Sequence, residues 1–147
     1  SICIAYEDYP AHRAQWSYAI RNFPADIYIH GRNGRSALRD QILKDAVYIE
    51  SVGELPAGHS LALLAPKEGD EMQGTEPLSA LAHPDNVVYF FGSNTESVLP
   101  AQFADRAPDH LVYVDLASHK DMWSWMAWAI VAYDRLTKNQ PHTTQEK

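Results

Sequence analysis

The sequence has little of three features that would assign it to a secreted, a membrane or a nucleic-acid-coating class. Cys3 is the single cysteine, which excludes a small scaffold held by internal disulfides and fits a reducing cytosol. No apolar run approaches the roughly 20 residues that a membrane-spanning helix needs. The 12 Lys and Arg residues stand against 19 Asp and Glu residues, a net charge of −7. That charge argues against non-specific binding to a nucleic-acid backbone and leaves a local basic patch open. We expect a soluble, cytoplasmic protein.

Short motifs of high specificity are absent as well. No G-x-G-x-x-G follows a strand-like segment and there is no P-loop, so ordinary dinucleotide and P-loop nucleotide binding are not expected. No G-x-S-x-G element marks a hydrolase nucleophile. The seven histidines are scattered, and none lies three or four residues from another or beside the cysteine. We therefore expect no metal site.

The chain does contain a regular alternation of strand-like and helix-like segments. Its 147 residues, 46% of them apolar, suffice for one domain, which we place at residues 1–137, with a polar tail at 138–147. Strands are expected at Ile2–Tyr6, Asp26–His30, Ala46–Ser51, Ser60–Ala65, Asn86–Phe91 and His110–Leu116. Helices are expected at Ala11–Asn22, 36–44, Pro77–Ala82 and Lys120–Leu136. This order predicts an α/β fold with a roughly six-stranded parallel sheet and helices on both faces.

Two of the expected strands indicate where a site would lie. Asn86–Phe91 and His110–Leu116 are apolar almost throughout, as parallel strands covered on both faces are. Polar loops follow them, at Gly92–Ser97 and Ala117–Asp121. Loops after parallel strands open at the carboxyl edge of the sheet, where open α/β folds bind their ligands. We therefore expect the functional site at that edge.

The last expected helix is apolar on two sides. Two stripes follow helical spacing, one of Met122, Met126, Ala129, Ile130 and Tyr133, the other of Trp125, Trp128, Ala132 and Leu136. A helix on one sheet buries only one stripe, so the stripe with the two tryptophans predicts a subunit interface, a homodimer through Trp125 and Trp128. The alternative is that connections of the same chain cover this stripe.

Three stretches resemble the landmarks of a known family in order and spacing. After the first strand, Gln15 and Arg21 are spaced like the family's asparagine and arginine. The strand at 87–91 ends in Gly92-Ser93-Asn94-Thr95-Glu96-Ser97-Val98, where the family has Gly-Asn-Glu-x-x-Gly-Leu. Tyr113-Val114-Asp115, five further residues and then Asp121-Met122-Trp123 stand where the family has Ile-Pro-Met and, after a similar gap, Ser-Leu-Asn. In this arrangement the chain resembles the SPOUT superfamily of methyltransferases, in particular the TrmH-like RNA ribose 2′-O-methyltransferases.

The resemblance implies a fold, a partner and a cofactor. The fold is a parallel sheet whose C-terminal segment is tucked through a loop as a trefoil knot, in a dimer formed through the last helix. The cofactor is S-adenosylmethionine, held largely by main-chain groups of three loops. The resemblance assigns its binding to Leu64, Ala65, Pro66, Gly92, Ser93, Val114, Leu116 and Met122. Ordinary core packing is the alternative for Leu64 and Met122, whereas Gly92 fits close approach of the backbone.

The resemblance also assigns catalytic roles to Arg21 and Asp121. In the family, an arginine at the position of Arg21 helps to activate the attacking 2′-hydroxyl and holds the neighbouring phosphate. The alternative is a solvated helix arginine. Asp121 could act as a general base, as in related enzymes that methylate a base nitrogen, or could cap the last helix. Trp123 could stack on a nucleobase or fill the core. A loose basic cluster could bind an anionic ligand; it contains Arg13, Arg21, Arg32, Arg35 and Arg39.

Two functions follow from these features. The first is methyl transfer from S-adenosylmethionine to RNA, at a ribose 2′-hydroxyl or at a base, and it is favoured by the family identities of Arg21 and Gly92. The second is a catalytically inactive SPOUT-like binding or assembly module. It is favoured by Asn94, Asp121 and Trp123, which stand where the family has glutamate, serine and asparagine.

Overall fold

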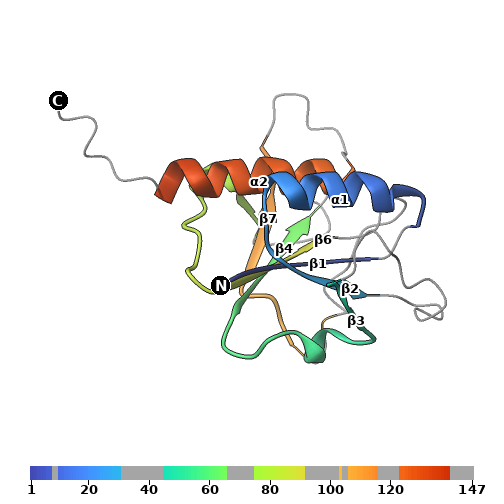
Figure 1. Ribbon diagram of the computed structural model, residues 1–147. Coiled ribbons are helices and arrows are strands. Elements are labelled where there is room, and N and C mark those ends of the chain that lie inside the picture. Colours follow the sequence, from blue (N-terminus) through green and yellow to red (C-terminus); the bar gives the residue numbers. More distant parts are fainter. Residues whose placement is uncertain are drawn as a thin grey trace.

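The computed structural model describes residues 1–7, 10–30, 45–65, 75–91, 103, 106–115 and 123–139. Their strands form one parallel sheet of seven strands in the order β3-β2-β1-β6-β4-β7-β5 (Figure 1). The strands are β1 (Ile2–Glu7), β2 (Asp26–His30), β3 (Val47–Ile49), β4 (Ser60–Ala65), β5 (Glu76–Pro77), β6 (Val87–Phe91) and β7 (His110–Tyr113). The predicted parallel α/β fold is confirmed.

The described helices differ in detail from the expected ones. The α-helices are α1 (Arg13–Asn22) and α2 (Ser124–Asn139), and the short 3₁₀ helices are η1 (Pro10–His12), η3 (Val52–Glu54) and η4 (Leu78–Ala80). α2 continues past the expected end at Leu136 to Asn139, and the expected helix at 36–44 lies outside the described residues.

The seventh strand is a correction to the expected sheet. The sequence predicts a helix at Pro77–Ala82, whereas the chain forms the two-residue strand β5 and then η4. Proline has no N–H to donate to a sheet and is confined to edge strands. Pro77 meets this condition, because β5 is the edge strand beside β7.

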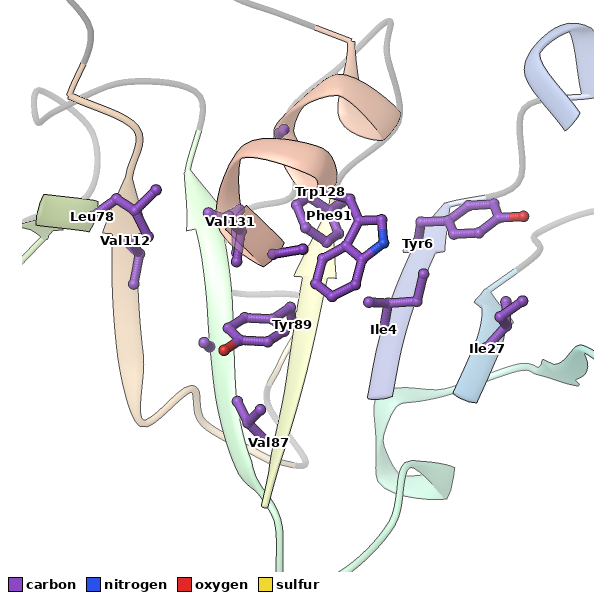
Figure 2. Close-up of a cluster of buried hydrophobic side chains, with 14 of the residues drawn as sticks. Ile4, Tyr6, Ile27, Leu78, Val87, Tyr89, Phe91, Val112, Trp128 and Val131 are labelled. Carbon is purple, nitrogen blue, oxygen red and sulfur yellow. The ribbon is translucent and has the colours of Figure 1, made fainter. Parts of the chain in front are cut away.

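Hydrophobic cores lie on both faces of the sheet. α1 and α2 lie side by side over one face (Figure 1), and Figure 2 shows the core beneath them, where Trp128 of α2 packs near Tyr89 and Phe91 of β6. Within the described residues the opposite face is covered by η3 and Phe103 rather than by an α-helix. The strand β6 is buried along its whole length because both cores contact it.

Trp128 corrects the expected subunit interface. Its side chain is 1% exposed, and its indole N–H donates to the carbonyl oxygen of Phe23, at 3.2 Å. The chain therefore covers Trp128 itself, as in the alternative interpretation, and of the tryptophan stripe Trp128 and Ala132 face the core. Trp125 is partly buried beside His12. The exposed large apolar residues on α2 are Met126, Tyr133 and Leu136.

A polar network attaches α2 to the sheet. His83 is fully covered and lies between the hydroxyl of Tyr89, at 2.6 Å from Nδ1, and Oδ2 of Asp134, at 2.7 Å from Nε2. Arg135 donates to the same Tyr89 hydroxyl. The ammonium group of Lys138 forms an ion pair with Asp134 and donates hydrogen bonds to the carbonyl oxygens of Leu78, in η4, and Leu81, just after it. Burial is the main reason that the pKa of His83 lies below its ordinary value and that the pKa of Tyr89 lies above it.

The described residues test two further expectations only in part. The trefoil knot would involve the segments 92–102 and 116–122, which lie outside them, so the knot stays a prediction. Neither α1 nor α2 has the length and apolarity of a helix that crosses a membrane.

Candidate active site

Three neighbouring strands bring the expected cofactor loops to one place. β4 lies between β6 and β7, and the pairs Leu64 with Phe91 and Ala65 with Tyr113 end these strands at the same level of the carboxyl edge. Leu64 is 8% exposed, and Val114 packs beside the same core. Outside the described residues, where their roles stay predictions, lie Pro66, Gly92, Ser93, Leu116, Asp121 and Met122.

Arg21 lies at the opposite edge of the sheet. α1 follows the carboxyl end of β1 and returns to the amino end of β2, so its last turn reaches the amino edge. There Arg21 is exposed and lies over the ring of Tyr18, 4.7 Å from the centroid. Phe23 lines a groove at this edge together with Ile2, the first residue of β1. The resemblance assigns Arg21 a catalytic role, whereas the structure places it near the amino edge, because the ends of a ten-residue helix lie about 15 Å apart.

Arg13 is the arginine at the carboxyl edge among the described residues. It is the first residue of α1, and its side chain is 8% exposed. Arg106 precedes β7 and Arg135 lies beside Ile2, so both are at the amino edge. Because a helix N-terminus carries partial positive charge, Arg13 and the first turns of α1 and α2 contribute positive charge at this edge, which also holds the carboxyl groups of Glu7 and Asp115.

A stacked aromatic pair packs against the end of β6, beside the candidate site. The rings of Tyr6 and Trp16 lie 4.1 Å apart with their planes at 5°, and both side chains are 1% exposed. Trp16 also meets Phe91 with the ring centroids 5.8 Å apart. Phe91 is the last residue of β6, so this packing fixes the position at which the loop of Gly92 begins.

Glu7 and His30 form a hydrogen-bonded pair at the ends of β1 and β2. Oε2 of Glu7, which is 7% exposed, lies 2.8 Å from Nδ1 of His30. Nε2 of His30 lies 3.1 Å from the carbonyl oxygen of Glu50. A carbonyl oxygen only accepts hydrogen bonds, so Nε2 of His30 donates to Glu50, and the pair joins the ends of β1 and β2.

Asp115 is held by η4 just after β7. The backbone N–H of Ser79 donates to Oδ1, at 3.1 Å, and its hydroxyl donates to Oδ2, at 2.6 Å. The hydroxyl bond is the largest of the causes that lower the pKa of the Asp115 carboxyl group below its usual value. Asp115 therefore stays ionised at neutral pH and fixes the direction in which the chain leaves β7 toward Leu116.

An aromatic cluster stands at the starts of the two helices. His12 immediately precedes α1 and Trp123 immediately precedes α2. Their rings lie 4.5 Å apart at 89°, and the indole N–H of Trp125 donates to Nδ1 of His12, at 3.3 Å. Trp123 is 42% exposed, so the expectation that it fills the core is wrong and its outer surface is open at the carboxyl edge.

Comparisons with known proteins identify the fold. No protein-family model and no curated protein matches the chain by sequence. TrmJ from Z. mobilis ZM4 matches with a TM-score of 0.69 at 16% identity, over 95% of this chain and 69% of its own. The SpoU methyltransferase AviRb from Streptomyces viridochromogenes matches at 0.68 and 13% identity, over 93% and 60%. An AdoMet-bound rRNA methyltransferase from Sinorhizobium meliloti matches at 0.69 and 12%, over 96% and 57%. The chain has the SPOUT fold.

The SPOUT fold confirms the resemblance at the level of architecture and changes the set of candidate residues. Sequence reasoning places Arg13 only in a loose basic cluster and does not single out Glu7 or His12. Their position relative to the first strand is the signal for them, because the start of a helix that follows a parallel strand lies at the carboxyl edge. By the same rule, the last turn that holds Arg21 lies at the amino edge.

Metal ligands do not gather in the described part of this SPOUT fold. In the described residues, no three of its His, Cys, Asp and Glu side chains are grouped as a metal ion would require.

Proposed function

We propose that this protein is an S-adenosylmethionine-dependent methyltransferase that acts on RNA, at a ribose 2′-hydroxyl or at a base. The observation that carries the proposal is the convergence of β4, β6 and β7 at one carboxyl edge of a SPOUT fold. Among the solved neighbours with this fold, one is described as an rRNA methyltransferase, and two are described with AdoMet bound.

The residues at the three strand ends fit such a cofactor. Adenine needs a flat apolar slot with backbone donors and acceptors at its edge. Leu64 and Val114 supply apolar side chains at neighbouring strand ends, and we assign the slot to them and to the proposed loop residues. These are Ala65 at the end of β4 and the loop residues Pro66, Gly92, Ser93, Leu116 and Met122. When bound, S-adenosylmethionine supplies an activated methyl group.

The chain's own groups would orient and deprotonate the substrate. Arg13, rather than Arg21, is the arginine that we assign to the substrate phosphate, because it lies at the carboxyl edge. Asp121 stays the proposed general base, with the helix cap as the other proposal. In-line displacement then requires mainly correct positioning of the nucleophile.

We also propose a homodimer through α2, with a different set of residues from the sequence prediction. Met126, Tyr133 and Leu136 are 39%, 64% and 53% exposed, and Figure 1 shows α2 beside α1 in the layer over the sheet. Large apolar side chains gathered on one helix favour a self-complementary interface.

Calorimetric titration with S-adenosylmethionine tests the function most directly. We expect micromolar binding, and transfer of a radiolabelled methyl group from it to total RNA. Binding without transfer to RNA would point to another acceptor. No binding at millimolar ligand would leave the alternative of an inactive binding or assembly module.

The two roles of Asp121 are separated by one substitution. Asp121→Asn should lower turnover by roughly 10²–10⁴-fold at unchanged stability if the carboxylate is the general base. A cap tolerates asparagine, so unchanged turnover would assign Asp121 to the cap.

A further inference from the structure

Trp123 exposes much of its indole beside the candidate active site. It directly precedes α2 at the carboxyl edge and is 42% exposed, whereas Trp16 and Trp128 are each 1% exposed. An indole that is open to this extent adds little to the core. Its surface is therefore available to a molecule that approaches the site.

The indole is held from one side by His12. The two rings meet edge-on, with centroids 4.5 Å apart and planes at 89°. His12 is itself fixed by Trp125, whose indole N–H lies 3.3 Å from Nδ1 and whose ring is 6.2 Å away at 87°. His12 comes from the start of α1 and the two tryptophans come from the start of α2. The two helices thus preorganise Trp123, which lowers the entropic cost of a contact with a ligand.

The charge near Trp123 indicates what kind of molecule this is. The first turns of α1 and α2 and Arg13, the chain neighbour of His12, supply positive charge near Trp123. Glu7 and Asp115 supply negative charge at the ends of β1 and β7. A ligand for this place combines a flat ring with a negative group, and a nucleotide has both. A protein partner fits better on the outside of α2, where Met126 and Tyr133 are exposed and neither helix N-terminus is near Tyr133.

We propose that Trp123, positioned by His12, stacks on an unpaired nucleobase of the RNA substrate. This inference rests on the proposed function and adds a substrate class to it. A base within a duplex has both faces covered by its neighbours, so the substrate is a single strand, a loop or a flipped-out nucleotide. Base–aromatic stacking tolerates any base, so Trp123 provides affinity and position and does not read sequence.

Binding of a fluorescein-labelled single-stranded RNA of about 12 nucleotides, followed by anisotropy, tests whether Trp123 and His12 form a stacking platform for a base. Trp123→Leu should weaken binding about 10-fold or more, because stacking is lost, and Trp123→Phe should retain most of the affinity. The matched control is Tyr18→Leu, which removes an exposed ring of α1 that lies under Arg21, away from the site, and should bind like the parent. A sugar–phosphate oligomer of the same length without bases should bind the parent and Trp123→Leu equally.

The same proteins separate failure of the platform from failure of the proposed function. A parent that binds S-adenosylmethionine in calorimetry, with equal RNA affinity for the parent and Trp123→Leu, would remove the platform and keep the methyltransferase. A parent that binds no S-adenosylmethionine would remove the proposed function, and the RNA data alone would then decide on the platform. The wavelength of tryptophan emission could instead shift with protein concentration in the parent and not in Trp123→Leu. That result would place Trp123 between two copies of the chain and overturn the proposal.

Discussion

The hydroxyl oxygen of Tyr89 lies 2.6 Å from Nδ1 of His83, beneath α2. Arg135 can only donate, and it donates to the same oxygen. With a neutral His83, the hydroxyl proton of Tyr89 is directed to Nδ1 and the proton on Nε2 is directed to Asp134. Burial, the largest cause of the lowered pKa of His83, favours this neutral ring. Lys138, the other nearby cation, also favours the neutral ring.

We expect the protein to lose stability as the pH falls below about 6.5. In the unfolded chain His83 has an ordinary pKa of about 6.5, whereas its pKa in the folded protein is lower. Below pH ~6.5 the unfolded state binds a proton that the folded state does not bind, so the free energy of unfolding decreases until the pH reaches the folded pKa. Above that range His83 adds no pH dependence. Thermal unfolding between about pH 8 and pH 5 measures the effect.

The variant His83→Gln identifies the group responsible. It should be less stable than the parent at about pH 8, because a buried network loses a partner, and its stability should change less with acid. An acid dependence as steep as the parent's would show that other groups cause it.

Truncation of Trp128 should destabilise the folded protein without requiring any change of assembly. Trp128 is 1% exposed in the core (Figure 2), so Trp128→Ala should lower the free energy of unfolding by about 3–5 kcal/mol. Trp123→Ala is the matched control, because Trp123 is 42% exposed, and it should cost about 1 kcal/mol or less. Urea unfolding compares the two. Equal losses would contradict the assignment of Trp128 to the core.

The proposed dimer depends on the exposed face of α2. Tyr133→Glu should give monomers in size-exclusion chromatography with light scattering, because it places a charge without a partner in a dry interface. Val47→Glu is the control, since Val47 is 49% exposed on the edge strand β3, from which β2 and β1 separate the strand β6 that packs against α2. A monomeric parent would remove the dimer proposal altogether.

The two arginines of α1 should differ in methyl transfer. Arg21→Ala should keep transfer to RNA within about twofold, because Arg21 is exposed at the amino edge. Arg13→Lys keeps the charge but loses the fork that binds a phosphate through two bonds, and transfer should fall by roughly 10-fold or more at similar cofactor affinity. Circular dichroism checks that both variants fold. Loss of transfer in Arg21→Ala alone would restore the assignment that the sequence suggests.

The sheet was predictable because its central strands leave a strong pattern. Val87–Phe91 is apolar at every position, and burial by a core on each face is the physical reason. The prediction of a helix at Pro77–Ala82 was wrong because a two-residue edge strand is too short to show a periodic pattern in the sequence. Trp128 was placed on the wrong face because spacing alone shows that a helix has two apolar stripes and does not show which one meets the sheet.

The edge of the sheet that holds the candidate site was predictable from the sequence, but the residues of the site were predictable only in part. Carboxyl ends of parallel strands meet by topology, so the edge itself was predictable from the order of the strands. Leu64 and Val114 were named through the family resemblance, and their role in binding stays a prediction. Arg21 was chosen by its spacing from Gln15, and spacing within a helix does not fix which end faces the loops. Arg13 carries no motif, and only the direction of α1 reveals it.

The central place of β1 has a consequence during synthesis of the chain. Cys3 pairs with Asp26 on one side and with Val88 on the other. β2 follows soon after β1, whereas β6 is made only after most of the domain. At roughly 5–20 residues per second, one edge of β1 stays unpaired for several seconds on the ribosome. An open apolar edge is a template for pairing with other chains. Nascent copies on one polysome are therefore most prone to aggregate during the synthesis of residues 31–91, and slower translation would lengthen that interval.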